Sequence, residues 1–265
     1  SGRPYDEVLK SGELLAQVMI DEWQEFRHDI ILLEIGTACS AEAMGAKVEY
    51  DVDRSAVSHG PAIASLDEVG TLVIPDNFED KPSWKVTLDA VRILRKELGD
   101  EVAICGRADQ GPFSLASMLR GMEDFMMDIG DPDVDDTNLH QLMEICEEVV
   151  FRYAQATQQA GADCTSIGES FAGPDMMSPD DYRRLAFPHE QKVIQRVQKE
   201  LGLPFHLHIC GSAGPIIEDM VNTTAKVLEI DQDTDIKVAK SITQGKCVLH
   251  GNVEPAKCIF GTPDI

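Results

Sequence analysis

The sequence has no long apolar run, no excess of basic residues and no regular cysteine spacing. No stretch approaches the roughly 20 consecutive apolar residues of a membrane-spanning helix. Lys+Arg 23 against Asp+Glu 47 give a formal charge of −24, which opposes contact with nucleic acid or anionic lipid. The sequence has seven cysteines, an odd number, at irregular spacing, and this argues against a disulfide framework. The first residues also lack the layout of a signal peptide. We therefore expect a cytoplasmic protein that binds neither nucleic acid nor membranes.

Several common site motifs are absent as well. The segment Gly168–Gly173 has neither the spacing and lysine of a phosphate loop nor the Gly-x-Ser-x-Gly order of a hydrolase nucleophile. The acidic segment 131–136 lacks the turn glycine and closing glutamate of an EF-hand loop. A solvated acidic loop is the interpretation we adopt for it.

Strand-like and helix-like segments alternate along the chain. We expect strands at 30–35, 102–106, 164–167, 206–210, 227–231 and 248–251. We expect helices at 8–27, 83–98, 115–129, 138–160 and 178–200, the last broken at Pro188, with short helical segments at 215–221 and 236–241. Such alternation is typical of parallel β/α units. A (β/α)8 TIM-type barrel is the simplest closure, and a doubly wound open sheet is the alternative.

The length suits one barrel domain over residues 1–265. The chain ends at Gly261-Thr262-Pro263-Asp264-Ile265, where Thr-Pro is a start signal for a helix. We therefore expect the last β/α unit or units of the barrel to lie beyond Ile265.

The hexapeptide Phe205-His206-Leu207-His208-Ile209-Cys210 is the most informative segment. Alternate side chains of a strand point to opposite faces, so an apolar row is backed by a row of His206, His208 and Cys210. An imidazole and a thiolate two residues apart can reach one zinc ion. An ordinary buried strand with a core histidine and an inert cysteine is the alternative.

Other polar residues follow the expected strands. In a parallel barrel the active site lies at the carboxyl ends of the strands. At these ends we find Asp109, Glu169, His208, Cys210, Glu229, Asp231, His250 and Asn252. Each acid or amide can instead cap a helix or close a turn. The six cysteines other than Cys210 show no paired spacing, and we expect them to be packing residues.

Six segments resemble the uroporphyrinogen decarboxylase superfamily. They are Ala41–Ala46, Gly111–Ala116, Ser178–Tyr182, His208-Ile209-Cys210-Gly211, Leu228-Glu229-Ile230-Asp231 and Gly251-Asn252-Val253-Glu254-Pro255. The resemblance extends from about residue 30 to the end of the chain, and it implies a (β/α)8 barrel.

The resemblance implies one of two chemistries. True decarboxylases carry an Arg-rich amino-terminal signature and an aspartate that holds the pyrrole nitrogens. The signature is absent here, and Gly36 stands where the aspartate is expected. The other branch comprises zinc-dependent methyltransferases that work with a corrinoid protein and use a His-x-Cys pair and a later cysteine. His208 and Cys210 match the pair, and the later cysteine is expected beyond Ile265.

We therefore predict an enzyme of this second branch, a zinc methyltransferase similar to methylcobalamin:coenzyme M methyltransferases. It would exchange a methyl group between a corrinoid (cobalamin) on a partner protein and a thiol acceptor or a methoxyl or methylamine-type donor. His208 and Cys210 are the expected metal ligands. Glu229, Asp231 and Glu169 are candidates for catalysis, and Asp109, Asn252 and His206 for substrate binding. A uroporphyrinogen decarboxylase and a non-catalytic binding protein for a tetrapyrrole or small molecule are the alternatives.

Overall fold

A computed structural model describes residues 4–33, 36–51 and 56–261. The strands are β1 (Ile30–Leu33), β2 (Lys47–Glu49), β3 (Val57–Gly60), β4 (Ala103–Gly106), β5 (Thr165–Gly168), β6 (Phe205–Ile209), β7 (Val227–Ile230) and β8 (Val248–His250). The α-helices are α1 (Tyr5–Val8), α2 (Gly12–Phe26), α3 (Cys39–Ala43), α4 (Pro82–Leu98), α5 (Pro112–Arg120), α6 (Met122–Gly130), α7 (Asp136–Ala160), α8 (Pro179–Asp181), α9 (Phe187–Leu201), α10 (Ile217–Asn222), α11 (Ile236–Thr243) and α12 (Pro255–Phe260). Short helical turns are η1 (Leu66–Thr71), η2 (Phe78–Asp80), η3 (Tyr182–Ala186) and η4 (Gly214–Ile216).

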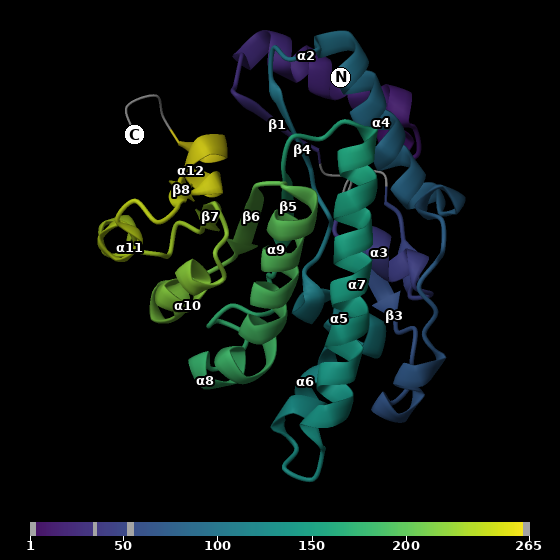
Figure 1. The fold of residues 1–265 in the computed structure, drawn as a ribbon, viewed down its shortest axis with the longest axis vertical. Coiled ribbons are helices and arrows are strands. Elements are labelled where there is room, and N and C mark those ends of the chain that lie inside the picture. Colours follow the sequence, from purple (N-terminus) through teal and green to yellow (C-terminus); the bar gives the residue numbers. More distant parts are fainter. Residues whose placement is uncertain (1–3, 34–35, 52–55, 262–265) are drawn as a thin grey trace.

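Six of the described strands form one parallel arrangement. β1 pairs with β4, and β5, β6, β7 and β8 pair in that order, all in parallel. Bridges from Cys105 to Cys164 and from Gln110 to Gly168 join the two groups. The resulting order is β1-β4-β5-β6-β7-β8, with helices gathered around it and α7 and α9 side by side (Figure 1). The predicted parallel β/α alternation is therefore confirmed.

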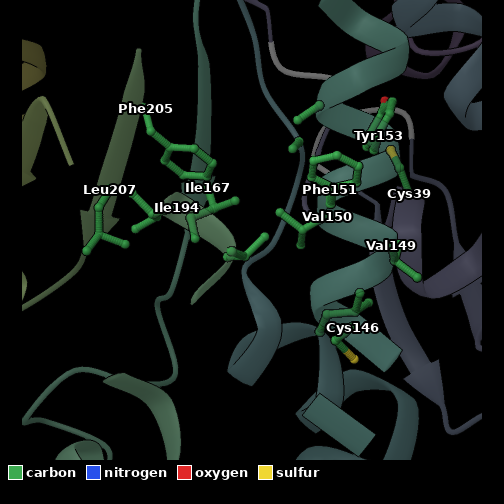
Figure 2. Close-up of a cluster of buried hydrophobic side chains, with 14 of the residues drawn as sticks. Cys39, Cys146, Val149, Val150, Phe151, Tyr153, Ile167, Ile194, Phe205 and Leu207 are labelled. Atoms are coloured by element: carbon green, nitrogen blue, oxygen red, sulfur yellow. The ribbon is translucent and has the colours of Figure 1, made fainter. Parts of the chain in front are cut away.

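The apolar row of β6 forms part of the core. Phe205, Leu207 and Ile209 are fully buried. Figure 2 shows Phe205 and Leu207 in one buried cluster with Ile167 of β5, Ile194 of α9 and residues of α7. Burial of each such side chain stabilises the fold by about 1.5 to 3 kcal/mol. The opposite row, which carries His206 and His208, is only partly covered. This division fixes which face of β6 is available for chemistry.

The structure differs from the predicted elements at several places. The predicted helix at 115–129 is two helices, because Gly121 between α5 and α6 has a φ of 92° that a helix cannot contain. The predicted break at Pro188 corresponds to a junction in a continuous helical run: the π-helical turn η3 (Tyr182–Ala186) ends directly before α9, and Pro188, the second residue of α9, offers no N–H to that turn. The antiparallel pair β2–β3 was not predicted, because the sequences of the two strands, Lys-Val-Glu and Val-Ser-His-Gly, contain one apolar side chain each. Residues 34–35 of the predicted first strand lie outside the described residues.

No helix among the described residues has the length and apolar character to cross a bilayer.

Candidate metal centre

The strand β6 brings its histidine and cysteine together at its carboxyl end. Nε2 of His208 lies 2.9 Å from Sγ of Cys210. Both side chains are partly exposed, and His208 retains 20% of its side-chain exposure. The pair is therefore accessible to a small molecule while its strand is held by the buried apolar row.

The turn after Cys210 has a fixed backbone. Gly211 has a φ of 77°, and a side-chain carbon there would overlap the carboxylate of Asp175. Thr234 ties the same turn to the loop after β7, because its Oγ1 donates to the Gly211 carbonyl at 3.0 Å and accepts from the amide of Ala213 at 3.0 Å. Glycine is thus required where the chain leaves the His208–Cys210 pair.

The two side chains change each other's protonation. The hydrogen bond with His208 lowers the pKa of the Cys210 thiol, against the opposing effect of burial. Burial alone would lower the pKa of His208, but Cys210 and the charge of Glu229 together raise it. A thiolate beside an imidazole is the form in which cysteine binds metals.

Glu229 of β7 stands directly beside His208. The two residues are register partners on neighbouring parallel strands. Oε1 of Glu229 lies 3.6 Å from Nδ1 of His208, which is close enough for charge attraction but too far for a hydrogen bond. Nδ1 is buried and has no hydrogen-bond partner among the described residues. A small movement of the carboxylate would provide one.

Ser170 is a member of the site that sequence reasoning missed. Its Oγ lies 3.4 Å from Sγ of Cys210. The residue directly follows Glu169 at the end of β5, so its position after a strand was the available signal. His208, Cys210, Glu229 and Ser170 therefore form one cluster from three neighbouring strand ends.

Glu169 faces away from this cluster. Its two carboxylate oxygens accept the amides of Phe113 at 3.0 Å and Ser114 at 2.8 Å, at the amino end of α5. The side chain is fully buried, and this burial raises its pKa to about 7 despite those hydrogen bonds. These contacts are those of a carboxylate that holds α5 against β5.

Asp109, Asp231 and Asn252 each form a hydrogen bond with a backbone group. Oδ2 of Asp109 accepts the amide of Ser40 at 2.7 Å. Oδ1 of Asp231 accepts the amide of Asp233 at 3.2 Å, within the loop after β7. Nδ2 of Asn252 donates to the carbonyl of Thr234 at 2.8 Å in the same loop. These three residues shape the strand-end loops around the cluster.

His206 lies one layer deeper on β6. It is close to Cys164, which in turn contacts Cys105 on β4. The contact with Cys105 lowers the pKa of Cys164 to about 6 against the effect of burial, and His206 acts in the same direction. His206 is therefore separate from the His208–Cys210 pair, and two of the expected packing cysteines touch each other.

The His208–Cys210 pair fits a zinc ion as part of a larger ligand set. Two ligands of one tetrahedral zinc stand about 3.5 Å apart, given Zn–N and Zn–S bonds of about 2.0 and 2.3 Å. The observed 2.9 Å separation needs only a slight widening. Within residues 4–33, 36–51 and 56–261, no three His, Cys, Asp or Glu side chains converge closely enough to hold a metal. The described residues thus offer two candidate ligands and, in Glu229, a carboxylate beside one of them.

A hollow of about 380 Å³ lies between β3 and the junction of α5 and α6. Phe171, which follows Ser170, lines it together with Met118 and Met122. Its size is in the lower part of the range for small-molecule sites, about 300 to 1,000 Å³.

Parallel strands surrounded by helices, with polar side chains at their carboxyl ends, define an α/β barrel of the TIM type. A solved structure of a methyltransferase from Methanosarcina mazei matches it with a TM-score of 0.85 at 28% identity, over 95% of this chain and 72% of that chain. The predicted barrel fold is confirmed by this likeness.

Curated relatives carry two activities. A methylcobamide:CoM methyltransferase of Methanosarcina barkeri is 27% identical over 256 residues, or 95% of this chain and 72% of the relative. A uroporphyrinogen decarboxylase of Chlorobium phaeovibrioides is 28% identical over 264 residues, or 97% of this chain and 72% of the relative. Residues 1–265 match the family described as uroporphyrinogen decarboxylase (URO-D). The chain belongs to this family, as the sequence motifs predicted.

Proposed function

We propose that this protein is a zinc-dependent methyltransferase that exchanges a methyl group with a corrinoid held by a partner protein in the cytoplasm. The observation that carries the proposal is the 2.9 Å separation of His208 Nε2 and Cys210 Sγ at the carboxyl end of β6. The methyltransferases among its relatives support the same branch of the family. The second substrate is a thiol acceptor or a methoxyl or methylamine-type donor.

His208 and Cys210 are the residues that would hold zinc. When bound, zinc would stabilise a substrate thiolate at neutral pH or polarise the oxygen of an ether donor. Glu229 would accept a hydrogen bond from Nδ1 of His208, and so fix the ring and keep Nε2 directed at the metal position. The Oγ of Ser170 would help to hold the Cys210 sulfur in place.

The surroundings of the cluster suit a small-molecule substrate. The partly exposed cluster opens at the strand ends, and the hollow beside Phe171 has an apolar lining suited to a small organic group. The partner protein would approach this same end of the barrel, since the corrinoid must reach the substrate.

The second candidate is a uroporphyrinogen decarboxylase, which the decarboxylases among the relatives favour. That reaction needs a carboxylate for the pyrrole nitrogens. Gly36 offers none, and Asp109, which lies beside Gly36 around the same cavity of about 10 Å³, accepts a backbone amide of α3. We therefore rank this function second.

Two assays on the natural full-length chain test the proposal. Purified protein is mixed with methylcobalamin and a thiol, and demethylation is followed in the cobalamin absorption spectrum. A parallel sample receives uroporphyrinogen, and its products are analysed. We expect zinc-dependent demethylation and no coproporphyrinogen. Normal turnover of uroporphyrinogen without methyl transfer would reverse the ranking. Absence of both activities and of stoichiometric zinc would favour a non-catalytic binding protein.

A further inference from the structure

Two buried cysteines meet where β4 and β5 lie side by side (Figure 1). Cys105 of β4 and Cys164, which directly precedes β5, are bridge partners in parallel register. The amide of Gly106 donates to the Cys164 carbonyl at 3.0 Å, and the amide of Cys164 donates to the Ile104 carbonyl at 3.4 Å. Register partners on parallel strands point to the same face of the sheet. The two thiols therefore lie together on one face.

The spacing of the two strands suits a disulfide. Neighbouring strands lie about 4.8 Å apart, and disulfides join residues whose Cα atoms are about 4.4 to 6.8 Å apart. The thiols of Cys105 and Cys164 are already hydrogen-bonded to each other. An S–S bond is thus within reach of the backbone as it stands.

The two thiols differ in reactivity. The hydrogen bond with Cys105 lowers the pKa of Cys164 to about 6, against the effect of burial. The same contact, followed by burial, raises the pKa of Cys105 well above its ordinary value. Cys164 also keeps 5% of its surface exposed, whereas Cys105 is fully buried. Because the thiolate is the nucleophilic form of cysteine, Cys164 is the sulfur that a small oxidant would meet first.

The pair of cysteines is separate from the candidate metal centre. Gly168, the register partner of His208, is four residues beyond Cys164 on the same strand. At about 3.3 Å per residue, the distance along the strand is about 13 Å. Chemistry at Cys164 and Cys105 would therefore leave His208 and Cys210 as they are.

We propose that Cys105 and Cys164 form a redox modification site, in which a hydroperoxide converts the two thiols into a disulfide between β4 and β5. The Cys164 thiolate attacks one peroxide oxygen, the O–O bond breaks, and the departing oxygen takes up a proton and leaves as water or an alcohol. Cys164 is then a sulfenic acid. The Cys105 sulfur displaces the sulfenic hydroxyl, so that an S–S bond forms, the S–O bond breaks, and the thiol proton leaves with the hydroxyl as water. The sulfurs together lose two electrons, and the peroxide gains them. A small thiol restores both cysteines by exchange.

Peptide mapping after peroxide treatment tests the site. The natural full-length chain is fully reduced, freed of reductant and treated with hydrogen peroxide, and its remaining thiols are then alkylated in denaturant. We expect mass spectrometry to find one peptide pair joined through Cys105 and Cys164, with the loss of two hydrogen atoms, and dithiothreitol to separate it. Cys258→Ala, which removes an exposed cysteine, is the matched control and should form the same disulfide.

Two variants separate the steps. In Cys105→Ser, the oxidation of Cys164 should stop at the sulfenic acid, which dimedone traps, because the thiol that displaces the hydroxyl is gone. In Cys164→Ser, neither the disulfide nor the dimedone adduct should form at this site. The corresponding readout in the parent needs no variant, so it stands even where a variant fails to fold.

Two results with the parent would overturn the proposal. One is complete alkylation of Cys105 and Cys164 after treatment with peroxide. The other is oxidation of Cys164 to a sulfinic acid without any joined peptide. The mapping requires no methyl donor or acceptor, so failure of the methyl-transfer assays would leave its result unchanged.

Discussion

Glu229 Oε1 lies 3.6 Å from Nδ1 of His208, on the neighbouring parallel strand and in the same register. The imidazole thus stands between a thiol on one nitrogen and a carboxylate near the other. In metal sites, such a carboxylate fixes the ring and raises the basicity of the ligand nitrogen.

We therefore predict that Glu229→Gln lowers methyl-transfer rate or zinc affinity by about 10- to 100-fold, the usual cost of losing this kind of partner. Asp231→Asn is the matched control on the same strand end. It should cost less, because Oδ1 of Asp231 accepts the amide of Asp233 within its own loop. Rates are read from the cobalamin absorption spectrum, and metal content by elemental analysis. Parental behaviour of Glu229→Gln in both measurements would leave that carboxylate a purely structural role.

Ser170 should support the cysteine ligand. Its Oγ is 3.4 Å from Sγ of Cys210, and a hydrogen bond there helps keep the sulfur ionised. We expect Ser170→Ala to weaken zinc binding several-fold, because the loss of one hydrogen bond reduces the binding free energy by about 1 kcal/mol. Competition with a chromogenic chelator measures this. Ser178→Ala, which removes a serine at the start of α8, should leave zinc affinity unchanged.

We expect substitutions of Glu169 to act mainly on the stability of the fold. Its carboxylate accepts two buried amides of α5. Glu169→Ala leaves both without an acceptor, and we expect a loss of about 2 to 5 kcal/mol in the free energy of unfolding. Glu169→Gln keeps one acceptor oxygen and should lose less. Glu144→Ala, at an exposed position of α7, is the control for denaturant unfolding. Should Glu169→Gln unfold like the parent yet transfer no methyl group, Glu169 would be catalytic.

The unfolding free energy should also depend on Glu190. This carboxyl is fully buried, and burial, followed by the charge of Glu169, raises its pKa well above the ordinary value of 4.5. Well below pH 4.5 the group is protonated in both folded and unfolded chains, and its burial then costs no stability through ionisation. As the pH rises towards its folded-state pKa, the unfolded chain releases the proton first, so stability falls.

Glu190→Gln should therefore flatten the decline of stability between pH 4.5 and neutral pH, because the ionisable group is gone. Glu200→Gln, on the exposed face of the same helix, should follow the parental curve. Urea unfolding at a series of pH values provides the comparison. Parallel curves for the parent and Glu190→Gln would show that Glu190 is not the source of the decline.

The strands, most of the helices and the His208–Cys210 pair could be predicted from the sequence. Side chains alternate along β6 with a period of two, so an apolar row that must be buried fixes where His208 and Cys210 point. Because β6 and β7 follow one another in the sequence and pair in parallel, Glu229 also lies beside His208.

Contacts between distant segments could not be predicted in this way. Glu169 faces α5 because the free amides of Phe113 and Ser114 lie there, and nothing next to Glu169 in the sequence marks that partner. Arg107 can lie against β5 only because Gly168, about 60 residues later, lacks a side chain. Ser170 meets Cys210 through the pairing of β5 with β6. Each depends on register, which local patterns do not specify.

Zinc content tests the central claim most directly. Elemental analysis is carried out on the natural full-length chain, on Cys210→Ala and on Cys258→Ala, which changes an exposed cysteine outside the cluster. The metal centre proposed here predicts about one zinc per chain in the parent and in Cys258→Ala, and loss of most of that metal in Cys210→Ala with an unchanged circular dichroism spectrum. Equal zinc in Cys210→Ala and the parent would contradict it.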